Sequence, residues 1–78
     1  MIKPHKYLDI NNSLLGIGAE VLKLLSSENI MRIHDIELAL RDSRGEKGLK
    51  LLLPTLNLLF ALGKIEYHQK IDSIELLR

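Results

Sequence analysis

The stretch LKLLLPTLNLLFAL, residues 49–62, is apolar at nearly every position. Proline is tolerated in the first turn of a helix but not in its interior, so Pro54 predicts that regular helix begins near Leu52 or Leu53. Gly63 is typical of the position just after a helix and predicts its end. A helix that is apolar all round has to be covered on every side, and a chain of 78 residues has little else with which to cover it. The sequence therefore predicts that part of this helix binds another polypeptide.

After Gly63 the spacing of the apolar residues changes from a helical period to a period of two. Apolar and polar residues alternate over residues 65–68 and again over residues 73–76, with Leu77 following, which is typical of half-buried strands. Residues 69–72 then form the turn of a β-hairpin, and they lack the Asn-Gly or Asp-Gly pair that would fix its register.

A helix is predicted upstream over residues 13–27, after capping residues of the Asn and Ser type. Its apolar positions follow a helical period and comprise Leu14, Leu15, Ile17, Ala19, Val21, Leu22, Leu24 and Leu25. The polar strip is narrow and comprises Gly16, Glu20, Lys23 and Ser27. Gly16 and Gly18 each cost about 1 kcal/mol relative to Ala inside a helix. They predict the close approach of another element, from the same chain or from another subunit.

Between these helices we expect a short strand over residues 30–33, a helix over about 34–43 and a turn over 44–48. The inward-facing positions of this middle helix are Ile36, Ala39 and Leu40. Glu37 and Arg41, four residues apart, are expected to form an ordinary solvated pair.

The order of elements predicts an α+β, mainly α fold. It is that of a winged helix-turn-helix, with three helices followed by a C-terminal β-hairpin. The domain spans residues 11–78, and the short strand is expected to join the two hairpin strands. Residues 1–10, in which Pro4 disfavours helix, are expected to form an extended arm.

The composition excludes several classes of protein. Eleven basic and ten acidic side chains give a formal net charge of +1, and there is no cysteine, so we expect neither strong attraction to polyanions nor a disulfide framework. The apolar run at residues 51–53 is far shorter than the roughly 20 residues of a membrane span. We therefore expect a cytoplasmic protein that does not enter a membrane.

No motif for catalysis or for cofactor binding stands out. The chain has no phosphate-binding glycine loop, and His5, His34 and His68 are far apart without the spacing of metal ligands. No Ser or Cys has an evident His base and carboxylate partner. We expect no enzyme activity, no cofactor and no metal.

DNA binding is the alternative function, because winged helices often insert the helix after the turn into the major groove. Asn57 could contact adenine from that helix. The candidate nucleic-acid contacts are Arg41, Arg44, Lys47, Lys50 and Lys70. On this reading the chain is a small winged-helix transcriptional regulator.

Two sequence blocks point to a family. The blocks SLLGIGA at residues 13–19 and LLFALGKIE at residues 58–66, together with HKYL at residues 5–8, resemble the small middle component of bacterial ABC-three-component systems. The resemblance implies a non-catalytic accessory subunit, encoded beside an SMC-like or Rad50-like ABC ATPase and an effector, in systems associated with defence against phage. Pro54 departs from what that family's helix would be expected to carry.

We therefore expect an adaptor that binds the ATPase subunit and the effector subunit and so couples DNA sensing to effector control. It would contact DNA only through the complex, and a homodimer is a further alternative. The candidate interface residues are Lys3, His5, Tyr7, Leu8, Leu53, Asn57, Leu58 and Ala61.

Overall fold

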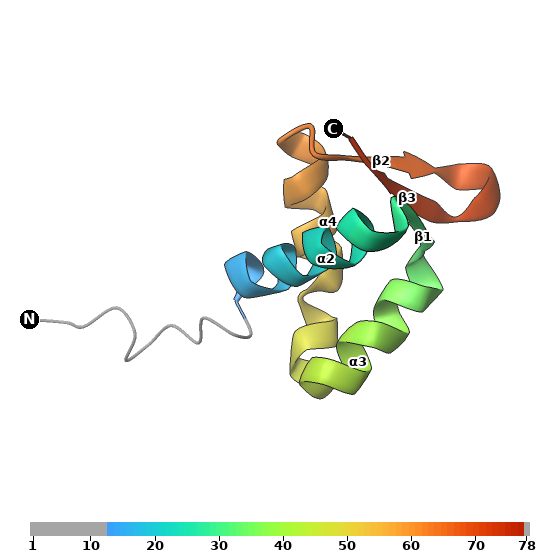
Figure 1. Cartoon of the computed structure of the whole chain (residues 1–78). Coiled ribbons are helices and arrows are strands. Elements are labelled where there is room, and N and C mark those ends of the chain that lie inside the picture. Colours follow the sequence, from blue (N-terminus) through green and yellow to red (C-terminus); the bar gives the residue numbers. More distant parts are fainter. Residues whose placement is uncertain (1–12, 78) are drawn as a thin grey trace, which may run out of the picture.

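The computed structural model describes residues 13–77 as three helices and a three-stranded antiparallel sheet (Figure 1). The elements are α2 (Leu14–Glu28), β1 (Ile30–Arg32), α3 (Ile33–Lys50), α4 (Leu52–Ala61), β2 (Ile65–His68), the short 3-10 helix η1 (Gln69–Ile71) and β3 (Ser73–Leu76). This arrangement confirms the predicted α+β, mainly helical, winged-helix-like fold. The predicted arm, with Lys3, His5, Tyr7 and Leu8, lies outside the described residues.

Helix α2 begins and ends with the capping residues that the sequence supplies. The Ser13 hydroxyl accepts a hydrogen bond from the Gly16 N–H at 3.2 Å, which satisfies one of the free donors of the first turn. At the other end Asn29 adopts a positive φ of 70° and donates its N–H to the Leu25 carbonyl at 2.6 Å. Asparagine tolerates this conformation better than most residues, so the predicted helix and its end are confirmed.

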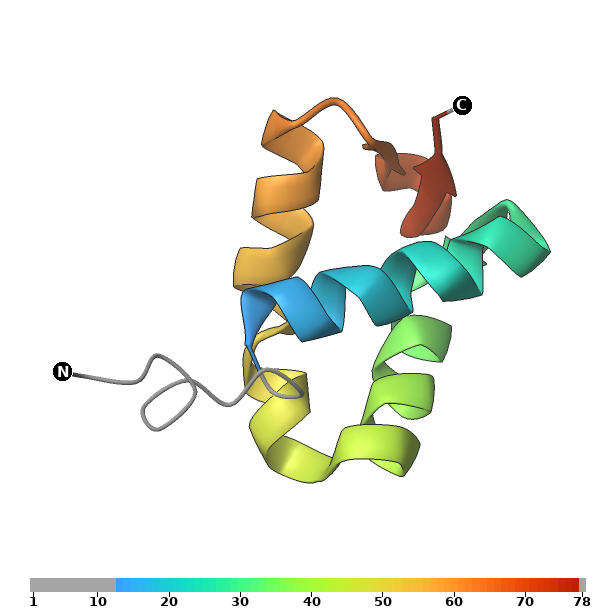
Figure 2. The ribbon, with the colours of Figure 1, turned by 60° about the vertical axis from the view of Figure 1, so that its left-hand side comes forward.

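Helix α3 is longer than predicted. Residues 46–48, expected as part of a turn, form one more helical turn together with Leu49 and Lys50, and the interruption is confined to Gly45 with φ 71° and ψ −164°. Only glycine adopts this backbone conformation without strain. A single residue therefore makes the corner within α3. Figure 2 shows the chain turning sharply there before a further helical turn leads into α4.

Helix α4 confirms the predicted start and end. It begins at Leu52, so Pro54 is its third residue, where the missing N–H has no partner within the helix. At the end Gly63 has φ 73°, and the N–H of Lys64 donates to the Leu59 carbonyl at 3.0 Å. This pattern is a Schellman cap, in which glycine at positive φ closes the helix.

The hairpin of β2 and β3, called the wing below, is joined by the short strand as predicted. The strand order is β1-β3-β2, and Tyr67 on β2 lies opposite Ile74 on β3. The wing turns through η1 and Asp72, which has a φ of 48°. The Tyr67 hydroxyl donates to Asp72 Oδ1 at 2.7 Å. This bond raises the pKa of Tyr67 because the nearby carboxylate disfavours a second negative charge.

The core lies between the three helices and one face of the sheet. It comprises Ile17, Val21, Leu25, Ile36, Leu40, Leu52, Leu56, Leu59, Ile65 and Ile74. Gly18 on α2 faces Thr55 on α4, and a Cβ at Gly18 would meet Thr55 Cγ2 at 3.6 Å. The close approach predicted at Gly18 is therefore a contact within the chain. Thr55 is fully buried there, and its hydroxyl has no hydrogen-bond partner in the described part of the chain.

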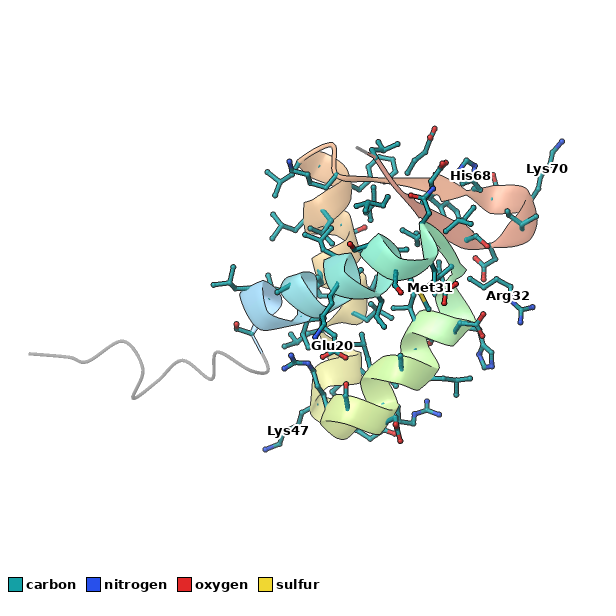
Figure 3. The ribbon with its side chains drawn as sticks, in the orientation of Figure 1. Glu20, Met31, Arg32, Lys47, His68 and Lys70 are labelled. Atoms are coloured by element: carbon teal, nitrogen blue, oxygen red, sulfur yellow. The ribbon has the colours of Figure 1, made fainter. Side chains whose placement is uncertain are left out.

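Glu20, on the predicted polar strip of α2, forms a half-buried link between α2 and α3 (Figure 3). Arg44 Nε donates to Glu20 Oε1 at 2.5 Å, and the Ser43 hydroxyl donates to Oε2 at 2.6 Å. Burial alone raises the pKa of Glu20. The hydrogen bonds from Ser43 and Arg44 and the charge of Arg44 outweigh this effect and hold the pKa below its ordinary value of 4.5.

Replacing Gly45 by Ala should destabilise the domain. A side chain at positive φ and extended ψ costs about 1–3 kcal/mol, and we expect the free energy of unfolding, measured with urea and circular dichroism, to fall by that amount. The control is Gly18→Ala, in which the added methyl group makes an ordinary contact and the helix gains intrinsic propensity, so stability should not fall. Equal stability of Gly45→Ala and the unchanged protein would show that the corner does not require glycine.

The link between Glu20 and α3 should make the free energy of unfolding depend on pH. Because the pKa of Glu20 is lowered in the folded state, its contribution should be complete above pH 4.5 and should be lost as pH falls towards the folded pKa. We expect Glu20→Gln to cost about 1 kcal/mol at pH 7 and progressively less at lower pH. Exposed Glu46, replaced by Gln, is the control. A Glu20→Gln difference that stays constant down to pH 3 would contradict the link.

Candidate protein-interaction surface

Helix α4 buries only one of its sides. Its buried residues are Leu52, Thr55, Leu56 and Leu59, spaced by three or four positions as expected for a single helical face. Two other sides of the helix are exposed: Leu53 (68%) and Phe60 (56%) face the wing, and Leu58 (43%) and Leu62 (61%), at the C-terminal end, face α2. Exposed clusters of large apolar side chains are typical of interaction sites.

The first hollow on this surface lies between α4 and the wing and is called the α4–wing hollow. It has a volume of about 400 Å³ and is lined by Ile33, Leu53, Leu56, Asn57, Phe60, Ile65, Tyr67 and Ile74. Helix α4 supplies its apolar side wall, and the sheet supplies its floor through Ile65 and Ile74. Asn57 and the Tyr67 hydroxyl are its polar side-chain groups, so the hollow is suited to apolar side chains with few polar contacts.

The second hollow lies between α2 and α4 and is called the α2–α4 groove. It has a volume of about 290 Å³ and is lined by Leu14, Leu15, Gly18, Ala19, Leu22, Thr55, Leu58, Leu59, Leu62 and Lys64. Leu14 and Leu15, which the sequence placed on the covered stripe of α2, are exposed here. They lie in the first turn of α2, beyond the reach of the core, which begins at Ile17.

The interface residues predicted on α4 divide between these two hollows. Leu53 and Asn57 line the α4–wing hollow, and Leu58 lines the α2–α4 groove. Ala61 is exposed in the last turn of α4. The structure thus places these residues on one helix but not in one patch.

The sequence analysis missed Phe60 and Tyr67, which both line the α4–wing hollow. Phe60 could have been found, because it lies three residues after Asn57 and seven after Leu53, which places all three on one helical face. Tyr67 could not, because its place beside α4 depends on how the wing folds back onto the helix.

The basic residues predicted to contact nucleic acid are not gathered into one ridge. Arg44 is held by Glu20, and Arg41 Nε lies 3.5 Å from Glu46 Oε1 instead of pairing with Glu37. Lys47 and Lys70 are exposed at opposite ends of the molecule (Figure 3). Lys50, the last residue of α3, is exposed as well.

The outer face of the wing, opposite to α4, is acidic. Glu66 and Glu75 are direct cross-strand partners, and His68 Nε2 lies 2.7 Å from Glu75 Oε1. One ligand atom from each of the three residues lies within 4.8 Å of the others. Strand pairing brings these groups together, which their separation along the sequence conceals. All three remain accessible to solvent.

Among residues 13–77, none of the helices has both the length and the apolar character needed to cross a lipid bilayer.

Comparison with known proteins identifies a family. The family model of ABC-three component (ABC-3C) system Middle Component 8 matches residues 29–77, which is more than half of the chain and includes β1, α3, α4 and the wing. Searches of curated proteins and of solved structures gave no match. The resemblance seen in the sequence is thus confirmed, and the chain belongs to the Middle Component 8 family of ABC-three component systems.

Proposed function

We propose that the protein is a non-catalytic, cytoplasmic adaptor subunit that binds other components of its ABC-three component system through the exposed side of α4. The observation that carries this proposal is the exposure of Leu53, Phe60 and Leu62 on a domain of this size. Full burial of such side chains contributes about 1.5–3 kcal/mol each. A protein partner would gain this contribution by covering them.

The character of α4 favours a protein over DNA as the ligand. In a winged helix the helix after the turn is the one that enters the major groove, and contacts to phosphate supply much of the affinity. Here that helix presents leucines and a phenylalanine, while Arg41 and Arg44 lie beside carboxylates of the same chain. A formal net charge of +1 adds little long-range attraction to DNA.

The linings of the α4–wing hollow and of the α2–α4 groove favour binding over catalysis at these two hollows. Acid–base or nucleophilic catalysis needs titratable groups that converge on a substrate. Among residues 13–77, the α4–wing hollow offers an amide and a phenol, and Lys64 is the only titratable side chain that lines the α2–α4 groove. The resemblance of the sequence implies that catalysis resides in an SMC-like or Rad50-like ATPase and in an effector, which this subunit would couple in defence against phage.

Co-purification of the full chain with the other two components of the same system tests the proposal. We expect a stable complex, and we expect the double variant Leu53→Ser with Phe60→Ser to weaken it at least tenfold, because two apolar contacts are lost. The matched control is Leu38→Ser. Leu38 is a similarly exposed leucine on α3 and lines neither the α4–wing hollow nor the α2–α4 groove.

Absence of a complex with the unchanged protein would overturn the adaptor proposal. A salt-dependent, sequence-selective shift of promoter DNA by the isolated chain would support the transcriptional regulator instead. If light scattering shows a stable dimer of this chain and neither of the other components binds, the result would support a homodimer whose only role is self-assembly.

A further inference from the structure

Among residues 13–77, no strand pairs with the outer edge of β2. Strand β2 is the outermost strand in the order β1-β3-β2, and the Leu77 N–H donates to the Lys64 carbonyl at 2.9 Å. In an antiparallel ladder, residues that bond to the partner strand alternate with residues that do not. Lys64, Glu66 and His68 therefore point their backbone groups towards β3, whereas Ile65 and Tyr67 point theirs outward.

The alternation on the other side of β3 agrees with this assignment. The Leu76 N–H donates to the Asn29 carbonyl at 2.9 Å, on the β1 side. Leu76 is the partner of Ile65 in the register, so β3 does not use the backbone groups of Ile65. Within residues 13–77, no other backbone hydrogen bond takes up the N–H or C=O of Ile65 or Tyr67. The edge therefore offers two donors and two acceptors to an added strand.

The inner side of this edge is apolar. Ile65 and Tyr67 carry their side chains on the α4 side of the sheet, where both line the α4–wing hollow with Leu53 and Phe60. A strand paired with β2 would carry every second side chain on this same side. Those side chains would gain most if they were apolar.

The outer side of the edge carries uncompensated negative charge. Glu66 and Glu75 lie directly opposite each other, an arrangement that is unfavourable for like charges. His68 contacts Glu75, but no Lys or Arg within residues 13–77 forms an ion pair with either glutamate. A basic side chain on an added strand would supply the missing positive charge.

We propose that the β2 edge accepts an extended segment of another component of the system by strand addition, with apolar residues towards the α4–wing hollow and Lys or Arg towards Glu66 and Glu75. This inference rests on the proposed adaptor function and names the kind of segment that is bound. Backbone hydrogen bonds to Ile65 and Tyr67 give affinity, and the two rows of side chains give specificity. A second copy of β2 is disfavoured as the occupant, because it would add another Glu66 to the acidic face.

The test compares Tyr67→Pro with Tyr67→Ala in the complex with the other two components. Both variants lose the phenol and its bond to Asp72, but only Tyr67→Pro lacks the outward N–H, which the ladder with β3 does not use. Proline is accepted at such edge positions. We expect Tyr67→Pro to bind at least tenfold more weakly than Tyr67→Ala, with both variants folded by circular dichroism.

Two further measurements keep the inference testable if Tyr67→Pro fails to fold. Hydrogen exchange of the unchanged protein should show the Ile65 and Tyr67 amides protected in the complex, and Glu66→Lys should weaken binding more than Glu46→Lys on α3. If a complex forms and depends on Leu53 and Phe60, but the Ile65 and Tyr67 amides stay unprotected, strand addition is wrong and the adaptor function stands. If no complex forms, both are overturned.

Discussion

The packing of one side of α4 against α2 and the sheet determines what the rest of the domain can do. Thr55 lies against Gly18 at the centre of this contact, and Leu56 and Leu59 continue it into the core. These residues lie on one side of a ten-residue helix. The apolar residues elsewhere on the helix, such as Leu53 and Phe60, therefore stay largely exposed. A domain of this size exposes a large share of its surface, and here that share includes the side chains that a larger protein would bury.

The corner at Gly45 makes this packing possible. It ends the regular part of α3, so that one further helical turn leads into α4. Arg44, the residue before the corner, reaches back to Glu20 on α2, and Gly48 leaves room for the Arg44 side chain, since a Cβ there would lie 2.5 Å from Arg44 Cβ. A flexible backbone position, an ion pair and a missing side chain therefore act together to set the direction of α4.

Local signals made much of the fold predictable. Ser13, Pro54 and Gly63 each act within one helical turn, so the sequence placed the ends of α2 and α4 correctly. The prediction of a turn over residues 44–48 was wrong for residues 46–48, which are helical. Two glycines close together are typical of a loop, and the sequence alone does not show that Gly48 packs against Arg44. The candidate site was predictable only in part. Helical spacing alone predicts that Leu53 and Asn57 share one face of α4. The α4–wing hollow and the pairing of Glu66 with Glu75 arise instead from contacts between segments that are distant along the chain.

Lys64 belongs to two structures at once. Its N–H closes α4 by donating to the Leu59 carbonyl, and its own carbonyl receives the Leu77 N–H at the end of the wing. The backbone between α4 and β2 is thus hydrogen-bonded both to the helix and to the sheet. Any group bound to the exposed residues of the helix and any group bound to the wing would therefore be held at a spacing and orientation that the folded domain itself sets.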